Sequence, residues 1–95
     1  YYGAISALNK GIKINPNYKL YLYRGMSKGR INDFYGSISD FNKGLKLKPN
    51  EGLLFIARSA VKIKLGDMKS GCSDLKQAID LGHTFLQNDY FKFCE

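Results

Sequence analysis

The sequence has no tryptophan, one histidine, two prolines and two cysteines among its 95 residues. It also lacks any run of about 18 apolar residues, which excludes a membrane-spanning helix. Acidic residues are few, because 8 aspartates and glutamates stand against 15 lysines and arginines, for a formal charge of +7. This excess permits an acidic peptide, a nucleic acid or an anionic surface as a partner. Basic residues scattered along the whole chain are also typical of a surface that only keeps the protein soluble.

The chain also lacks the residue patterns of common active sites. We find no nucleophile–histidine–acid arrangement, no glycine-rich phosphate loop and no paired-carboxylate motif. His83, the lone histidine, is expected at a turn or a helix end rather than in catalysis. We therefore expect no enzyme activity, no cofactor and no metal site in these residues.

The residues that are present suit one small globular domain. Hydrophobic residues make up 44% of the chain and charged residues 24%, which is enough apolar material for a modest core and too ordinary a charge content for disorder. The pattern begins in mid-unit at Tyr1, so we interpret the chain as a fragment or a processed product. The composition does not indicate a compartment.

The sequence repeats itself. The segment NKGIKINPN at residues 9–17 returns as NKGLKLKPN at residues 42–50, 33 positions later, and a fainter third copy follows at an offset of 34. A period near 34 with two helical stretches per unit is typical of stacked helical hairpins, in which neighbouring units share one apolar core. We expect an all-α fold with helices at about 1–14, 18–31, 34–47, 51–65, 68–81 and 84–94.

Local signals mark the turns between paired helices. Asn32 and Gly66 fall where a residue must adopt a positive φ. Asp33 and Asp67 follow them and can cap the next helix.

The two full units carry apolar and small residues at matching offsets: Tyr21, Gly25, Ser37, Phe41, Gly44 and Pro49, then Phe55, Ser59, Gly71, Leu75, Ala78 and His83. The small members allow the paired helices to approach closely. This spacing resembles the tetratricopeptide repeat, and the words RG, GD and DFNKG resemble bacterial-type arrays. The resemblance implies a right-handed α-α superhelix of about six helices in one domain, residues 1–95. Its parts would be the second helix of a partial repeat at 1–16, repeats at 17–49 and 50–83, and a capping helix at 84–95.

Members of this family commonly bind peptides on a concave face that is lined by the first helix of each repeat. By resemblance, the partner-binding positions here are Lys19, Leu22, Tyr23, Met26, Arg30, Leu53, Ile56, Ala60, Ile63 and Lys64. They combine an apolar floor with basic edges, which favours a peptide with apolar anchors and acidic character. The lysine and asparagine set of the chaperone-binding members is not found, so that function is not carried over.

Both ends of the chain depart from the repeat pattern. The first unit keeps only its second helix, so the stripe that contains Ala4 and Leu8 lacks its usual cover and could support self-association. At the other end, Thr84 and Gln87 have the spacing of a capping box before a final helix rich in aromatic residues.

Two arginine–aspartate pairs share one spacing. Arg24 and Asp40 are 16 residues apart, as are Arg58 and Asp74. Antiparallel packing of the helices would bring each pair together, and we expect structural ion pairs that fix the register. The alternative is that the arginines bind a carboxylate of a ligand.

Cys72 and Cys94 are placed 10 and 12 residues from the turn at Gly82. Two antiparallel helices of similar length would set them side by side, so a disulfide is feasible in an oxidising compartment. Two buried free thiols are an equally good interpretation.

These features favour a protein–protein interaction module, a piece of a longer scaffold. The alternatives are an accessory nucleic-acid-binding module that uses the charge of +7, and an appendage of an enzyme whose catalytic part lies upstream.

Overall fold

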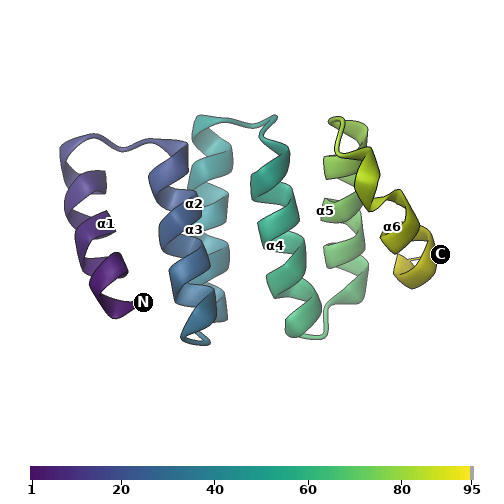
Figure 1. Ribbon diagram of the computed structural model, residues 1–95, viewed down its shortest axis with the longest axis horizontal. Helices are drawn as coiled ribbons and strands as arrows, with labels where there is room; N and C mark the ends of the chain where they lie inside the picture. The colour runs from purple at the N-terminus through teal and green to yellow at the C-terminus, as the bar shows by residue number, and fades with distance from the viewer. Residues whose placement is uncertain (95) are drawn as a thin grey trace. The chain divides into compact units, whose positions relative to one another are not determined.

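The computed structural model describes residues 1–94, and this part of the chain is all-α. Its regular structure consists of six α-helices and one short 3-10 helix (Figure 1): α1 Tyr2–Ile14, α2 Tyr18–Arg30, α3 Phe34–Leu47, α4 Gly52–Lys64, α5 Met68–Asp80, η1 Thr84–Leu86 and α6 Gln87–Cys94. The predicted fold class is confirmed, and the first five helices begin and end within one residue of their predicted bounds. Glu95, the last residue of the expected cap, lies outside the described residues.

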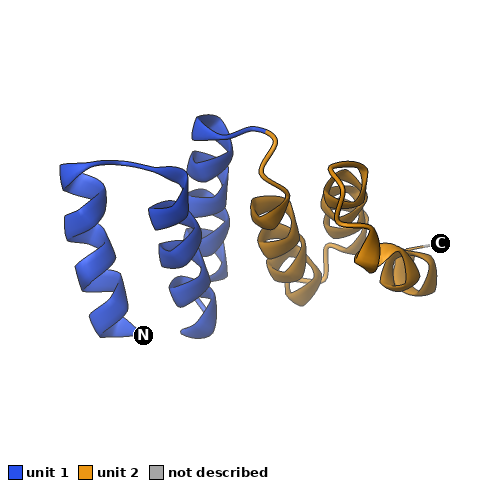
Figure 2. Ribbon diagram, turned by 45° about the horizontal axis from the view of Figure 1, so that its top comes forward, with its two compact units in different colours: residues 1–49 blue, residues 50–95 orange. Residues whose placement is uncertain are grey.

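The chain divides into two compact units, residues 1–49 and residues 50–95 (Figure 2). The division falls between Pro49 and Asn50, where the sequence places a repeat boundary. We call them unit 1, which contains α1, α2 and α3, and unit 2, which contains α4, α5, η1 and α6. The helices of unit 1 alternate in direction, so the end of α1, the start of α2 and the end of α3 lie at one end of that unit (Figure 1).

The predicted turns and caps are confirmed in both units. Asn32 has a φ of 66° and Gly66 a φ of 86°, and each lies in the turn that follows a hairpin's first helix. Asp33 accepts a hydrogen bond from the backbone N–H of Gly36, and Asp67 accepts one in the same way from Ser70. These bonds satisfy an amide that has no partner within its own helix.

Close approach of the paired helices explains the small residues of unit 1. The ring of Phe41, 1% exposed, lies against the backbone of Gly25, where an added Cβ would be 2.5 Å from the ring's Cε1 atom. Ser37, fully buried, donates a hydrogen bond of 2.6 Å from its hydroxyl to the carbonyl oxygen of Gly25. A larger residue at Gly25 would push α2 and α3 apart.

Unit 2 repeats this arrangement with other residues. Leu54 and Ala78 are fully buried, and Leu75 and Ile79 are 8% exposed. A Cβ on Gly71 would lie 2.7 Å from Cγ1 of Ile63 and 3.2 Å from the carbonyl oxygen of Ser59. Helices α4 and α5 therefore pack as closely as α2 and α3 do.

The segment after α5 differs from its prediction. Gly82 has a φ of 111° and ends the hairpin, as expected from a glycine at this position. The capping box predicted for Thr84 and Gln87 is wrong, because Thr84 begins the 3-10 helix η1 and α6 starts only at Gln87. The His83 imidazole fills the space that a side chain at Gly52 would need, so this segment is placed against the start of α4.

Among the described helices, α1 packs on one neighbour. It contacts α2, and Gly11 lies against Leu20, but no residue of α1 is fully buried. Within its predicted self-association stripe, Ala4 is exposed and Leu8 is partly covered.

Candidate functional site

A row of exposed side chains runs along one face of α2. Tyr23, Met26 and Arg30 are spaced so that they lie on the same side of a helix, with Lys19 one turn before them. Tyr23 is 51% exposed and Met26 is 40% exposed. Two large apolar groups in water on one helix face, followed by an arginine, are typical of a surface that binds a partner.

A pocket of about 170 Å³ opens along this row. Its lining consists of Tyr23, Met26, Ser27 and Arg30 from α2 and of Tyr1, which precedes α1. Because α1 and α2 are antiparallel, the start of α1 lies beside the end of α2 (Figure 1). The guanidinium carbon of Arg30 is 5.4 Å from the centre of the Tyr1 ring, a cation–π contact that holds both side chains at the rim.

The size and lining of the pocket limit what it can bind. A cavity of about 150 Å³ is large enough for benzene, so this one suits a single large apolar side chain. The tyrosine and methionine side chains provide the apolar surface, and methionine adapts to ligands of different shape. The Arg30 guanidinium can donate two parallel hydrogen bonds to a carboxylate next to the bound side chain.

Leu22 requires a correction to the expected set of binding residues. It is 7% exposed and belongs to the core of unit 1. Leu22 and Gly25 are one turn apart on the face of α2 that packs in the core, whereas Tyr23 and Met26 face solvent. A partner that docks on α2 does not reach Leu22 in this conformation.

The expected binding residues of unit 2 form a stripe on α4. Leu53 is 50% exposed, Ile63 is 36% exposed, Ala60 and Lys64 are also exposed, and Ile56 is partly covered. Ile63 also covers Gly71 of α5, so part of its surface is engaged inside unit 2. The stripe is apolar with one lysine at its end.

The two arginine–aspartate pairs are brought together, one in each unit. Arg24 donates hydrogen bonds of 2.9 and 2.6 Å from Nε and Nη2 to the two carboxylate oxygens of Asp40. Arg58 donates to Asp74 in the same way, at 2.8 and 2.7 Å. The Nε and Nη2 edge of each guanidinium is therefore occupied by an aspartate of the same unit, which favours the structural interpretation of these arginines.

A lysine adds to each pair. Lys28 Nζ is 3.2 Å from Asp40 and Lys62 Nζ is 3.0 Å from Asp74. The side chain of Asp40 is 1% exposed, so its charge is removed from water and depends on these cations. The hydrogen bond to Asp40 raises the pKa of Arg24 above its ordinary value, and burial opposes this effect only in part.

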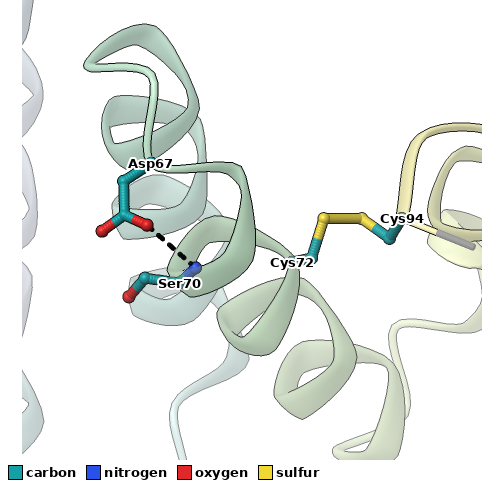
Figure 3. Close-up of a disulfide and its surroundings, with 4 residues drawn as sticks. All are labelled: Asp67, Ser70, Cys72 and Cys94. Atoms are coloured by element: carbon teal, nitrogen blue, oxygen red, sulfur yellow. Dashed lines mark hydrogen bonds between the residues drawn. A yellow bond between two sulfur atoms is a disulfide. The ribbon is translucent and has the colours of Figure 1, made fainter.

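Cys72 and Cys94 form a disulfide, with their Cα atoms 5.7 Å apart (Figure 3). It joins α5 to the last residue of α6. No residue of α6 is buried, and the disulfide ties the end of this helix covalently to α5. The sequence allowed either a disulfide or two buried free thiols, and the structure contains the disulfide.

No metal site emerges around the lone histidine. His83 lies edge-on to Phe85, with the ring centres 5.9 Å apart. Residues 1–94 contain no cluster of three or more histidine, cysteine, aspartate or glutamate side chains that could hold a metal ion.

The sequence reasoning missed two residues of the candidate site, Tyr1 and Ser27. Ser27 is four residues after Tyr23, a spacing that places both residues on the same side of a helix, so it could have been included. Tyr1 could have been found from the predicted helix bounds, because antiparallel helices at 1–14 and 18–31 place the first residue of one beside the last turn of the other.

No protein-family model matches this chain, and no curated protein is similar enough to count as a relative. Across the described residues, no helix has both the length and the apolar character needed to cross a membrane.

Proposed function

We propose that the chain is a protein-interaction module whose unit 1 binds a peptide at the pocket on α2. The observation that carries this proposal is the pocket itself. Tyr1, Tyr23 and Met26 provide an apolar recess of about 170 Å³, and Arg30 lies at its rim. One apolar side chain of the peptide fills the recess, and an acidic residue next to it pairs with Arg30.

The charges along α2 support an acidic character of the peptide. Lys19 and Arg30 are both exposed, at opposite ends of the row that contains Tyr23 and Met26. Exposed pairs of this kind contribute more to specificity and to the rate of association than to affinity. The apolar anchor therefore supplies most of the affinity, and the two basic residues select among apolar peptides.

The resemblance to tetratricopeptide repeats supports the same proposal from the sequence. In that family, the first helix of each repeat commonly lines the peptide-binding face, and in the proposed repeat at 17–49 this helix is α2. The α4 stripe holds the same place in the next repeat, and we propose it as a further apolar contact surface of the module.

A selection from a random peptide display library tests this function. The wild-type chain is expected to enrich peptides that carry a large apolar residue next to an aspartate or glutamate. The variant Tyr23→Ala/Met26→Ala should lose this enrichment, because both changes remove apolar lining from the pocket.

The matched control is Tyr35→Ala/Met68→Ala, which removes the same two residue types from exposed positions that do not line this pocket. It should enrich the same peptides as the wild type. Equal enrichment by both double variants would show that the pocket is not the binding site. The absence of any enriched peptide would count against the peptide-binding function as a whole.

A further inference from the structure

The charge of the chain is divided unequally between its two units. Residues 1–49 contain nine lysines and arginines and two aspartates, whereas residues 50–95 contain six basic and six acidic residues. The whole formal charge of +7 therefore belongs to unit 1. Basic residues occur along the whole chain, as the sequence indicates, whereas most of the acidic residues that would balance them lie in unit 2.

Within unit 1, most of the lysines gather at one end. This is the end where α1 and α3 finish and α2 begins (Figure 1). Five exposed lysines lie in the last two turns of α1 and α3 or in the first turn of α2: Lys10, Lys13, Lys19, Lys43 and Lys46. We call this surface the lysine end.

The two acidic residues of unit 1 do not balance the lysine end. Asp33 caps the start of α3, at the opposite end of the unit. Asp40 is buried and bound by Arg24 and Lys28. The lysine end therefore keeps a strong positive potential in water.

Two exposed aliphatic residues project from the same end. Ile14 is 85% exposed and Leu47 is 53% exposed. They are the last residues of α1 and α3 and occupy equivalent positions in the repeat. Each follows a lysine, Lys13 or Lys46, so an apolar tip with a basic neighbour occurs twice at this end.

A cavity of about 420 Å³ lies along α1, with a lining that extends from Ser6 to Lys13. Its lining includes Lys10 and Lys13 from α1 and Arg24 from α2, together with Ile12. The Nη1 atom of Arg24 donates a hydrogen bond to Asn9 at the same cavity. Arg24 is already paired with Asp40, so Lys10 and Lys13 are the two cations at this open space that can receive a phosphate group.

A simpler interpretation of some of these lysines accounts for only part of the pattern. Lys13 and Lys46 lie in the last turns of their helices, where a positive charge stabilises the negative end of the helix dipole. Stabilisation of the helix dipole does not explain why three further lysines lie at the same end, or why Ile14 and Leu47 are exposed there.

We propose that the lysine end of unit 1 docks on an anionic lipid surface. The lysines contact the phosphate headgroups, and Ile14 and Leu47 enter the boundary between the headgroups and the acyl chains. A nucleic acid offers phosphates too, but its binding surfaces favour arginine and exposed aromatic rings, whereas this end combines lysines with aliphatic side chains. An amphipathic surface of lysines and aliphatic residues is typical of peripheral membrane binding.

Lys19 belongs to both proposed surfaces, but the docking can be tested separately from the peptide pocket, which Lys19 does not line. The pocket on α2 lies between the start of α1 and the end of α2, at the opposite end of unit 1 from Ile14 and Leu47 (Figure 1). The variant Tyr23→Ala/Met26→Ala should therefore bind vesicles as the wild type does, whatever happens to its peptide binding.

Co-sedimentation with vesicles tests the inference, using the full chain. We expect binding to phosphatidylcholine vesicles that contain about one third phosphatidylglycerol, and much weaker binding to pure phosphatidylcholine. The variant Lys13→Glu/Lys46→Glu should bind the anionic vesicles at least about twentyfold more weakly, because each lysine near such a surface contributes about fivefold. The variant Ile14→Ser/Leu47→Ser should lose about tenfold at unchanged net charge.

The control variant Lys69→Glu/Lys76→Glu changes the net charge equally but places the changes on exposed residues of α5 in unit 2. It should bind anionic vesicles as the wild type does. If it loses as much as Lys13→Glu/Lys46→Glu, the effect is one of total charge and the lysine end is not the docking surface. Equal binding to both vesicle types, or tighter binding to a single-stranded or duplex oligonucleotide at the same salt concentration, would also overturn the proposal.

Discussion

Asp40, with a side chain that is 1% exposed, receives both Nε and Nη2 of Arg24, and the same bidentate contact recurs 34 residues later between Arg58 and Asp74. Each contact ties the first helix of a hairpin to the second. A buried carboxylate with two cationic partners is costly to disrupt, because removing one member leaves the others desolvated and unpaired.

The change Asp40→Ala should therefore lower the free energy of unfolding by about 3–5 kcal/mol, since Arg24 and Lys28 lose their counter-charge. Urea denaturation followed by circular dichroism measures the effect. Asp80→Ala is the control, because Asp80 pairs with Lys76 at 3.7 Å and both side chains are 57% exposed. It should cost less than about 1 kcal/mol. Similar losses for the two variants would contradict a structural role of the buried pair.

The packing of Phe41 on Gly25 predicts a cost for even one added methyl group. Gly25→Ala should lower the free energy of unfolding by about 1–3 kcal/mol, because the new Cβ would meet a ring that is itself buried. Gly3→Ala in α1 is the matched change, since a Cβ there meets nothing within 4 Å. It should be neutral or slightly stabilising, as expected from helix propensity. Thermal unfolding of both variants would decide the point, and a stabilised Gly25→Ala protein would show that α2 and α3 are not in close contact.

The disulfide predicts a local effect of reduction. In Cys72→Ser/Cys94→Ser, α6 should separate from α5, because none of its residues is buried and the link across 22 residues is lost. A loop of this size corresponds to about 3 kcal/mol of stabilisation. Hydrogen exchange followed by mass spectrometry should show faster exchange in residues 87–94 and unchanged exchange in α2 and α3. Unchanged protection of α6 would mean that side-chain packing alone holds it.

Arg30 predicts how the peptide site discriminates between ligands. Arg30→Gln should weaken binding of a selected acidic peptide by about twofold to fivefold, as expected for an exposed ion pair. For the same peptide with its acidic residue replaced by the corresponding amide, Arg30→Gln and the wild type should bind with equal affinity. Fluorescence anisotropy with labelled peptides measures both affinities. An equal loss for the two peptides would show that Arg30 contributes packing and not charge recognition.

Because α1 is incompletely buried, we still predict that the protein self-associates through this helix. Ala4 is exposed and Leu8 is partly covered, so a second copy could pack on this face at high protein concentration. Sedimentation equilibrium should then show a mass that rises with concentration, and Leu8→Glu should abolish the rise. A monomer at every concentration would exclude this contact.

The turns and helix caps of this protein could be predicted from the sequence, because each depends on a few neighbouring residues. The positive φ of Asn32 and Gly66 and the caps of Asp33 and Asp67 follow from turn chemistry that operates within a few residues. The spacing of Arg24 and Asp40 was informative because it places both residues in the middle of antiparallel helices.

Features that depend on packing could not be predicted in the same way. Leu22 lies one position from exposed Tyr23, and only the placement of α2 against α3 decides which of them is buried. Thr84 and Gln87 have capping-box spacing, but the chain leaves Gly82 at a φ of 111° and forms a 3-10 turn before α6 begins.

The most direct test of the central claim is to map the bound peptide by nuclear magnetic resonance on the isotope-labelled chain. A peptide enriched in the display selection is titrated while amide and methyl signals are followed. The account predicts that the largest shifts occur at Tyr1, Tyr23, Met26, Ser27 and Arg30, and that they saturate with one affinity. Shifts confined to other surfaces, with these five residues unchanged, would contradict it.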